Sequence, residues 1–344
     1  MRIGIVNDVK MTVEFLKLIV EETGFHKVAW VAVNGAEAVD KCAVDTPDLI
    51  LMDLVMPVMD GVKATQLIMK NSPCAILIVT ASVGANAPKV FEAMGFGALD
   101  VVKTPSIMQK GEEYHGAELK KKIDIIGKYL GMPLSGDEIE TPTRKFSRNK
   151  VPPLLVIGAS TGGPMALAKV LAKLPEACPY AIVIIQHVDE QFAEGLAQWL
   201  GKQISVKVSL AKDGMGPMAG HVFIAGKDKH LVMTDNLTLH YQDAPLDIPY
   251  RPSVDVFFQS VAGCWPEECM ALLLTGMGSD GARGMKMLHD KGWHTIAQNQ
   301  ASCVVFGMPK SAIELGGATE VLSLEDISLS VLRFMKKFHG QVRK

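Results

Sequence analysis

Three side chains that could perform acyl transfer stand where apolar runs end in the second half of the chain. The stretch LLVIGASTGGP, residues 154–164, breaks into small residues around Ser160. The run AIVIIQHV ends at His187, and ALLLTGMGSDGARG ends in a glycine-rich loop that carries Asp280. Because the carboxyl ends of parallel strands lie at one edge of a sheet, the three side chains could meet there. A serine beside an imidazole that a carboxylate orients is the arrangement of a nucleophilic hydrolase.

Two simpler interpretations of the IGASTGGP segment stay open at this point. A dinucleotide-binding loop requires G-x-G-x-x-G, and Ser160 stands where the second glycine belongs, which weakens that interpretation. A helix N-cap fits this segment as well as a nucleophile turn, because serine and threonine before GGPMALAKVL would satisfy N–H groups of the helix. The chain order Ser, His, Asp also differs from that of α/β-hydrolases, so the G-x-S-x-G pattern does not assign that fold.

A second set of polar residues ends the apolar runs of the first half. Asp8 follows the first run, Asp53 the third, Thr80 the fourth and Lys103 the fifth. Two carboxylates that converge on one edge repel each other unless Mg²⁺ and a lysine ammonium neutralise them. Such a site can accept a phosphoryl group. We expect Asp53 to be the acceptor, Asp8 and Asp53 to bind Mg²⁺, and Lys103 and Thr80 to contact the phosphoryl oxygens.

The elements that must position these residues follow an α/β rhythm. In the first 130 residues, RIGIV, VAWVAV, DLILMD, AILIVT and ALDVVK alternate with helical patterns, which predicts an open five-stranded parallel sheet. From 131 to 150 the periodicity disappears and Pro, Ser, Gly and mixed charges accumulate, as in a linker. Beyond it, PLLVIGAS, YAIVIIQHV, HVFIAG, HLVMTD, MALLLTG and HTIAQN supply further strands. We predict α/β domains at 1–125 and 151–344, joined by a linker at 126–150.

Composition excludes several other classes of protein. The 344 residues are 48% hydrophobic and 21% charged, with a formal net charge of -2 and no long basic run, so no nucleic-acid partner is expected. The six cysteines are scattered without a CxxC pair, which supports neither a disulfide framework nor a zinc site. No apolar run approaches the ~18 residues that cross a bilayer. We therefore expect a cytoplasmic protein without membrane insertion.

The first half resembles the receiver domain of two-component response regulators. The resemblance covers about residues 1–125 and rests on LMDLVMPVMDG around Asp53, with Asp8, Thr80 and Lys103 at the other strand ends. It implies a flavodoxin-like, doubly wound sheet, Mg²⁺ as cofactor and a CheA-type histidine kinase as phosphodonor. The chain departs from the pattern at Asn7, where receivers usually carry a second acid, and at the threonine between Lys103 and proline. We expect weakened but retained Mg²⁺ binding and phosphorylation of Asp53.

The second half resembles the catalytic domain of the CheB family of protein-glutamate methylesterases. The stretches IGASTGGP, QHV, RPSVD, LLTGMGSDGARG and SCVVFGMPKSAIELG carry this resemblance, which covers residues 152–340. It implies a Rossmann-like α/β domain and a substrate that is a glutamyl γ-methyl ester on a methyl-accepting chemoreceptor. Hydrolysis would release methanol without a cofactor. Deamidation of glutamine uses the same kind of intermediate and is left open.

The resemblance also implies finer roles for individual residues. Ser160 would be the nucleophile, His187 the base and Asp280 its orienter, while the Met277 N–H would stabilise the oxyanion, with Thr161 as a second candidate. Roles are also implied for the receiver, which would cover the catalytic face until phosphorylation releases it.

Three questions stay open from the sequence. Arg251 would position the acidic receptor helix, although an ion pair with Asp255 is equally compatible with RPSVD. The departures in the receiver are similar to a branch that serves surface-sensing, Wsp-like pathways. The alternative function is a partner-binding module in which Ser160 is only a helix cap.

Overall fold

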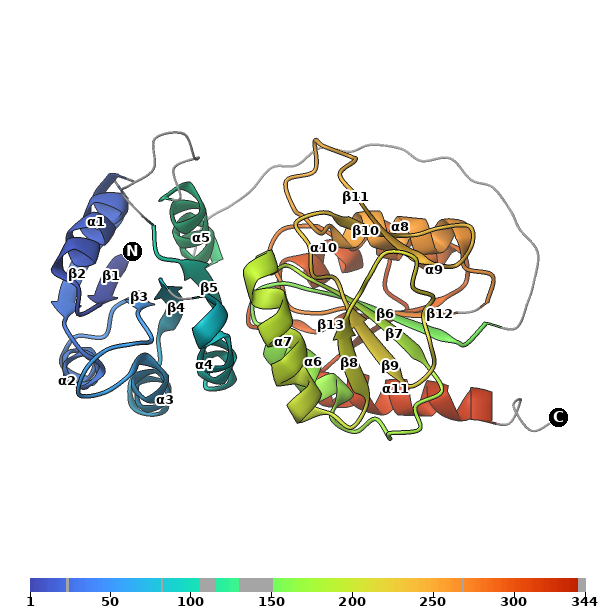
Figure 1. Ribbon diagram of the computed structural model, residues 1–344, viewed down its shortest axis with the longest axis horizontal. Coiled ribbons are helices and arrows are strands. Elements are labelled where there is room, and N and C mark those ends of the chain that lie inside the picture. Colours follow the sequence, from blue (N-terminus) through green and yellow to red (C-terminus); the bar gives the residue numbers. More distant parts are fainter. Residues whose placement is uncertain (23–24, 82, 106–115, 130–150, 268, 340–344) are drawn as a thin grey trace. The chain divides into compact units, whose positions relative to one another are not determined.

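The chain forms two compact units, Met1–Asp137 and Glu138–Lys344, and each is described by itself. The structure is a computed structural model that describes residues 1–22, 25–81, 83–105, 116–129, 151–267 and 269–339 (Figure 1). Most of the predicted linker lies outside these residues, and its predicted start falls inside the last helix of the first unit. The domain limits therefore stay a prediction.

The N-terminal unit is a five-stranded parallel sheet with helices on both faces. The strand order is β2-β1-β3-β4-β5, so the chain changes direction across the sheet between β1 and β3. Figure 1 shows α1 and α5 on one face and α2, α3 and α4 on the other. The elements are β1 Arg2–Val6, α1 Lys10–Glu22, β2 Lys27–Ala32, α2 Gly35–Val44, β3 Leu49–Met52, α3 Gly61–Asn71, β4 Ala75–Thr80, α4 Val83–Gly95, β5 Asp100–Lys103 and α5 Gly116–Tyr129.

The strands of this sheet coincide with the apolar runs of the sequence because their side chains are buried under helices. All residues of β3 are buried, and β1 and β4 are buried over nearly their whole length, as expected for strands that helices cover on both sides. A ligand crevice forms where the strand order reverses, outside the carboxyl ends of the strands. In this sheet that place lies beyond the carboxyl ends of β1 and β3. The strand order and the parallel pairing confirm the predicted receiver fold.

The C-terminal unit is built on a seven-stranded sheet in the order β14-β13-β12-β6-β7-β9-β8, with all neighbours parallel. Helices α6, α7 and α11 lie on one face, and α8, α9 and α10 lie on the other (Figure 1). The elements are β6 Leu154–Ala159, α6 Gly163–Leu171, β7 Ala181–Gln186, α7 Glu190–Gln203, β8 Lys207–Leu210, β9 His221–Ile224, β10 His230–Met233, β11 Leu239–Gln242, α8 Val254–Cys264, β12 Cys269–Leu273, α9 Ala282–Asp290, β13 His294–Gln298, η1 Gln300–Ser302, α10 Met308–Glu314, β14 Glu320–Leu322 and α11 Leu324–His339.

The strand order of this sheet reverses beside β6. The chain builds β7, β9 and β8 on one side of β6 and then returns to add β12, β13 and β14 on the other. The crevice of the sheet is therefore expected at the carboxyl ends of β6 and β12. One predicted strand, β10, lies outside the sheet and pairs with β11 in an antiparallel ribbon.

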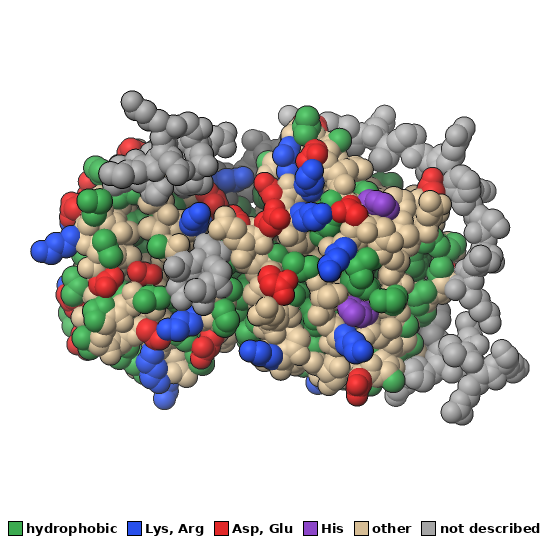
Figure 2. All heavy atoms as spheres, in the orientation of Figure 1, with side chains coloured by type: hydrophobic (Ala, Val, Ile, Leu, Met, Phe, Trp, Pro, Cys, Tyr) green, Lys and Arg blue, Asp and Glu red, His purple; other side chains and the backbone are tan. Residues whose placement is uncertain are grey.

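Within the described helices, none combines the length and apolar character that a bilayer span requires. Figure 2 shows basic and acidic side chains mixed over the visible face without an extended patch of one sign. This agrees with the near-zero net charge of the sequence.

Candidate active site

Ser160 lies in a tight turn between β6 and α6. Its N–H donates to the carbonyl of Thr275 at 3.0 Å, and its own carbonyl accepts from Gly163 N–H at 2.7 Å. The turn needs a left-handed residue, and Gly162 supplies it with a φ of 76°. Gly162 is also the N-cap of α6, and no side chain caps this helix end. The N-cap interpretation of Ser160 is therefore wrong, and its hydroxyl is left for other chemistry.

The segments of Ser160 and His187 are held side by side. Ala159 and Gln186 are partners in the register of β6 and β7, and Ser160 and His187 are the next residues along the two strands. The His187 N–H donates to the carbonyl of Ala159 at 3.0 Å. The Gln186 side chain donates to the carbonyls of both Ser160, at 2.9 Å, and His187, at 3.0 Å. Gln186 thus ties the two strand ends together.

His187 is oriented by Asp280 through its Nε2 atom. The distance from Nε2 to Asp280 Oδ2 is 2.7 Å, and a proton on Nε2 makes the donor for this bond. The other ring nitrogen, Nδ1, is buried and has no hydrogen-bond partner among the described residues. Within the same residues, the Ser160 hydroxyl makes no hydrogen bond either. A basic nitrogen and an unbonded hydroxyl therefore lie on adjacent strand ends.

Asp280 is a buried carboxylate held at the N-terminus of α8. It accepts hydrogen bonds from Ser253 Oγ and Val254 N–H, both at 2.7 Å, and from Asp255 N–H at 3.0 Å. Burial acts to raise the pKa of Asp280, but the hydrogen bond and charge of His187 and the bond from Ser253 hold it below its ordinary value. Asp280 is therefore ionised and can stabilise an imidazolium.

Ser253 and His230 extend this network behind Asp280. Ser253 Oγ donates to Asp280, while its backbone N–H donates to Nδ1 of His230 at 3.3 Å. His230 Nε2 lies 3.0 Å from the carbonyl of Pro245. The network is consistent with a catalytic triad centred on Asp280. Ser253 is fully buried and caps α8 through Val256 N–H, whereas Ser160 is partly exposed, so Ser160 is the more accessible of the two serines.

The two predicted oxyanion donors come from two different segments near Ser160. Thr161 follows Ser160 in the turn, and Met277 lies in the loop after β12. Neither backbone N–H donates to an acceptor within the described part of the chain. Thr275 connects the two segments, because its Oγ1 donates to the Thr161 carbonyl at 3.0 Å. Both N–H groups are thus available to an oxyanion.

Arg251 is not paired with Asp255. The Arg251 guanidinium donates to the carbonyl of Leu246 at 3.4 Å. The Asp255 carboxylate instead accepts from Gly284 N–H at 2.8 Å. Burial, followed by the nearby charge of Asp280, raises the pKa of Asp255 to about 7. The ion pair with Asp255 is therefore not formed. A role of Arg251 in positioning the substrate stays a prediction.

In the N-terminal unit, Asp53 lies at the predicted edge of the sheet. Its Oδ1 accepts from Leu54 N–H at 2.7 Å, and its Oδ2 accepts from the Asn7 side chain at 3.0 Å. Burial raises the pKa of Asp53 to about 6, and the charge of Asp8 adds to this effect. Asn7 therefore lies beside Asp53 and donates a hydrogen bond to it.

Thr80 and Lys103 are the last residues of β4 and β5, at the same carboxyl-terminal end of the sheet as Asp53. They are partners in the register of β4 and β5. Thr80 is buried, and Lys103 is partly buried without an ion pair or hydrogen bond of its side chain to any described residue. The Lys103 ammonium is therefore available to an incoming anion. The structure brings both residues to the edge that carries Asp8 and Asp53.

The donor set at this edge fits Mg²⁺. Asp8 and Asp53 are close enough for the charge of one to raise the pKa of the other, and Asn7 adds a neutral amide. Among the described residues, no cluster of three or more His, Cys, Asp or Glu side chains forms a metal site. Two carboxylates are sufficient for Mg²⁺, which keeps several waters and takes further ligands from a phosphate.

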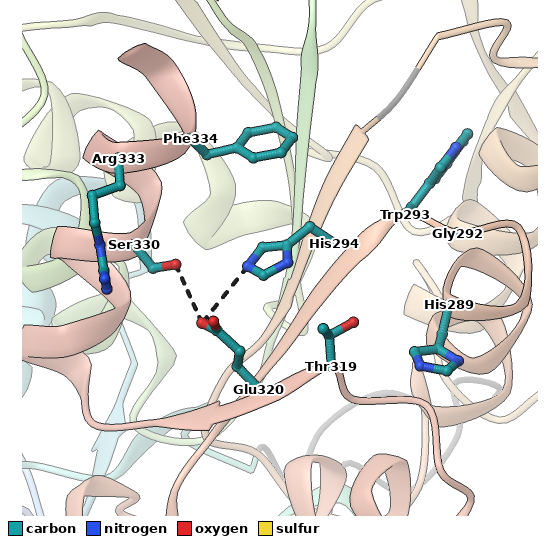
Figure 3. A pocket seen from close by; sticks show the side chains of 9 residues that line it. All are labelled: His289, Gly292, Trp293, His294, Thr319, Glu320, Ser330, Arg333 and Phe334. Carbon is teal, nitrogen blue, oxygen red and sulfur yellow. Dashed lines mark hydrogen bonds and ion pairs between the residues drawn. The ribbon is translucent and has the colours of Figure 1, made fainter. Parts of the chain in front are cut away.

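A separate pocket opens in the C-terminal unit at the amino ends of β13 and β14, the ends opposite to those that carry Ser160 and His187 (Figure 3). The Glu320 carboxylate accepts from Ser330 Oγ at 3.3 Å and lies 3.6 Å from His294 Nε2. Trp293, Phe334 and Arg333 also line it. None of the predicted site residues lines this pocket, so it is separate from the predicted site of acyl transfer.

The fold defines a receiver unit joined to a second α/β unit built on a seven-stranded parallel sheet. Comparison with protein-family models agrees: the model for CheB methylesterase matches residues 155–331, and the model for the response regulator receiver domain matches residues 3–113. The chain therefore belongs to the CheB methylesterase family and carries the receiver domain in addition.

Full-length relatives support this assignment. A "Protein-glutamate methylesterase/protein-glutamine glutaminase 4" from Burkholderia thailandensis is 50% identical over 339 residues, 98% of each chain. A "Protein-glutamate methylesterase/protein-glutamine glutaminase 3" from Pseudomonas aeruginosa is 47% identical, over 95% of this chain and 98% of its own. The crystal structure of the Thermotoga maritima CheB methylesterase catalytic domain is 34% identical and covers 54% of this chain and 100% of its own, with a TM-score of 0.51.

Proposed function

We propose that the C-terminal unit hydrolyses glutamyl γ-methyl esters on methyl-accepting chemoreceptors, with Ser160 as nucleophile. The observation that carries the proposal is the hydrogen bond of His187 Nε2 to Asp280, which leaves Nδ1 as the basic nitrogen beside the Ser160 turn. The names of the full-length relatives state the same activity and supply the ester as the substrate class.

The first half of the reaction forms an acyl-enzyme. Ser160 Oγ attacks the ester carbonyl while His187 Nδ1 takes its proton, and Asp280 stabilises the resulting imidazolium. The N–H groups of Met277 and Thr161 donate to the oxyanion of the tetrahedral intermediate. The bond from the carbonyl carbon to the methoxy oxygen then breaks. His187 returns the proton to that oxygen, and methanol leaves.

The second half releases the carboxylate. Water attacks the acyl carbon, His187 accepts a proton from the water, and the bond to Ser160 Oγ breaks as the proton returns to the serine. The product is a glutamate side chain. A glutamine amide would follow the same steps with ammonia as leaving group, and the relatives' names include this glutaminase activity.

The receiver unit takes a phosphoryl group on Asp53 in this proposal. An Asp53 oxygen attacks the phosphorus of a phosphohistidine on a CheA-type kinase, and the bond from phosphorus to the histidine nitrogen breaks. Lys103 pairs with a phosphoryl oxygen, and Thr80 supplies a hydroxyl to another. Asp8 and Asp53 would hold Mg²⁺, which when bound offsets the negative charge that gathers on the phosphoryl oxygens.

Two finer assignments stay predictions. We expect the unphosphorylated receiver to restrict access to the catalytic unit, because differential stability of a covered and an open state is sufficient for such control. A surface-sensing, Wsp-like pathway is consistent with a relative from Pseudomonas putida that is named for a group 3 operon and is 47% identical. Co-purification with chemoreceptors of the host would identify the pathway.

A serine-directed inhibitor tests the proposed function. The full-length protein is treated with a fluorophosphonate, and the modified peptide is identified by mass spectrometry. We expect one adduct, on Ser160, and none in the His187→Ala variant. Ser253 serves as the internal control because it is buried and already donates to Asp280. Absence of labelling in native protein, or labelling of Ser253, would contradict the proposal.

A further inference from the structure

The ring of Tyr250 lies flat on the imidazole of His187. The two ring centroids are 4.7 Å apart and the planes differ by 2°. Tyr250 is partly buried and belongs to the loop between β11 and α8. The chemistry proposed above uses Ser160, His187 and Asp280, and gives no role to this contact.

Orientation of His187 requires more than the bond to Asp280. One hydrogen bond at Nε2 leaves the ring able to tilt about χ2, which is a broad torsion for histidine. A tilt would carry Nδ1 out of line with the Ser160 turn. A second flat ring stacked parallel to it, with the centroids 4.7 Å apart, opposes this motion, because a tilt brings one edge of the imidazole toward the Tyr250 ring.

The same ring faces the charge that forms during the reaction. When His187 takes the Ser160 proton it becomes a cation, and an aromatic face attracts a cation electrostatically. Burial, followed by the charge of Asp280, raises the pKa of Tyr250, so its phenol stays neutral. The ring therefore acts as an uncharged aromatic cover that keeps water from this side of His187.

The Tyr250 hydroxyl reaches the loop of the oxyanion candidate. A Cβ placed on Gly278 would lie 3.0 Å from the hydroxyl oxygen of Tyr250. Gly278 is next to Met277. Tyr250 thus extends from the base to the segment that supplies an N–H to the oxyanion.

We propose that Tyr250 is a positioning residue for His187 in ester hydrolysis. Its ring holds the imidazole in the plane that presents Nδ1 to Ser160 and stabilises the imidazolium. This inference rests on the proposed function and adds a residue through which the base is oriented. The predicted requirement is for a flat aromatic face at this position rather than for the hydroxyl group.

Two substitutions separate the ring from the hydroxyl. In the phosphorylated full-length protein acting on methylated receptor, Tyr250→Leu keeps an apolar cover but removes the aromatic face. We expect its kcat to fall by about 10- to 100-fold with KM within about twofold, as for a misplaced catalytic group. Tyr250→Phe keeps the aromatic face, and we expect its kcat to stay within about threefold of the native value. Thermal unfolding of both variants checks that the fold is kept.

A spectroscopic signal reports the position of the base directly. With histidine labelled by ¹⁵N, the proton shared by His187 Nε2 and Asp280 gives a downfield resonance. We expect Tyr250→Phe to keep its chemical shift and Tyr250→Leu to move or broaden it. A native kcat in Tyr250→Leu, or an equal loss in Tyr250→Phe, would overturn the proposal. Ser160→Ala is measured in parallel: if it is inactive, only the role of Tyr250 is lost, and if it is active, the proposed function itself fails.

Discussion

Nε2 of His187 and Oδ2 of Asp280 are 2.7 Å apart, and this contact determines which nitrogen of the imidazole can act as a base. In the best-known serine hydrolase triads the aspartate binds Nδ1 and the serine faces Nε2. Here the assignment is reversed, since Nδ1 is the buried nitrogen without a partner among the described residues. Asp280 reaches Nε2 from the loop between β12 and α9.

The first prediction concerns Asp255, which lies beside Asp280. Its pKa is raised to about 7, so its ionisation lowers the stability of the folded state as the pH rises from the lower pKa of the unfolded chain to that value. Asp255→Asn keeps an acceptor for Gly284 N–H and removes the charge. We expect the stability of the variant relative to native protein to increase between pH 5 and pH 8.5, by about 1 to 3 kcal/mol.

Urea unfolding of the C-terminal unit within the full chain measures this difference at both pH values. Asp228→Asn is the matched control, because it removes a carboxylate from an exposed position in the same unit. A control with the same pH dependence as Asp255→Asn would show that the effect comes from net charge alone.

The second prediction concerns Asp53 and Asn7. Without Mg²⁺, the Asp53 carboxyl carbon should titrate by NMR with a midpoint near pH 6. Asn7→Asp removes the bond to Asp53 Oδ2 and adds a like charge, so the midpoint should move to higher pH. The same variant should bind Mg²⁺ several-fold more tightly, since it supplies a third carboxylate. An unchanged Mg²⁺ affinity would mean that Asn7 is not at the metal site.

The third prediction tests the turn that exposes Ser160. Alanine at Gly162 must adopt a φ of 76° and would place its Cβ 2.7 Å from Cβ of Val304. Gly214 has a similar φ of 80° with nothing within 4 Å of an added Cβ. Gly214→Ala should therefore cost about 1 kcal/mol of unfolding free energy, from backbone conformation alone. Gly162→Ala should cost about 1 to 3 kcal/mol more, because overpacking adds to it, and equal costs would show that Val304 moves away freely.

The fourth prediction concerns control by the receiver. Removal of residues 1–150 should raise the rate of methanol release from methylated receptor above that of the unphosphorylated full chain. Phosphorylated full-length protein should approach the same rate, and Asp53→Asn should stay at the low rate when the phosphodonor is present. If the truncated and unphosphorylated proteins are equally active, the receiver does not restrict the catalytic unit.

Much of this structure follows from where apolar runs end. The strands β1, β3 and β4 of the receiver and the strands β6, β7 and β12 of the C-terminal unit are largely apolar runs, because helices cover both sheets on both faces. The rule that ligands lie beyond the carboxyl ends of such strands then selected Asp53 in one unit and Ser160, His187 and Asp280 in the other. The strands that the sequence did not predict, β8, β11 and β14, are short and only partly buried, so their composition gives little signal.

The remaining parts of the site depend on contacts between distant segments. Gln186 carries no sequence signal beyond its place in an apolar run, and its bonds to two backbone carbonyls require β6 and β7 in register. Tyr250 and Ser253 precede or begin α8 and carry no motif that points to His187 or Asp280. Arg251 and Asp255 are four residues apart in RPSVD, yet they contact different backbone groups. Only the packing of the loop against the sheet determines these partners.

The central claim is that the Ser160 hydroxyl is the nucleophile, and methanol release from methylated chemoreceptor measures it most directly. Ser160→Ala should reduce the rate by at least about 10³-fold, as removal of a triad member does, while the thermal unfolding midpoint stays near the native value. Ser253→Ala, which weakens the support of Asp280, should keep measurable turnover. Near-native methanol release by folded Ser160→Ala would contradict the account.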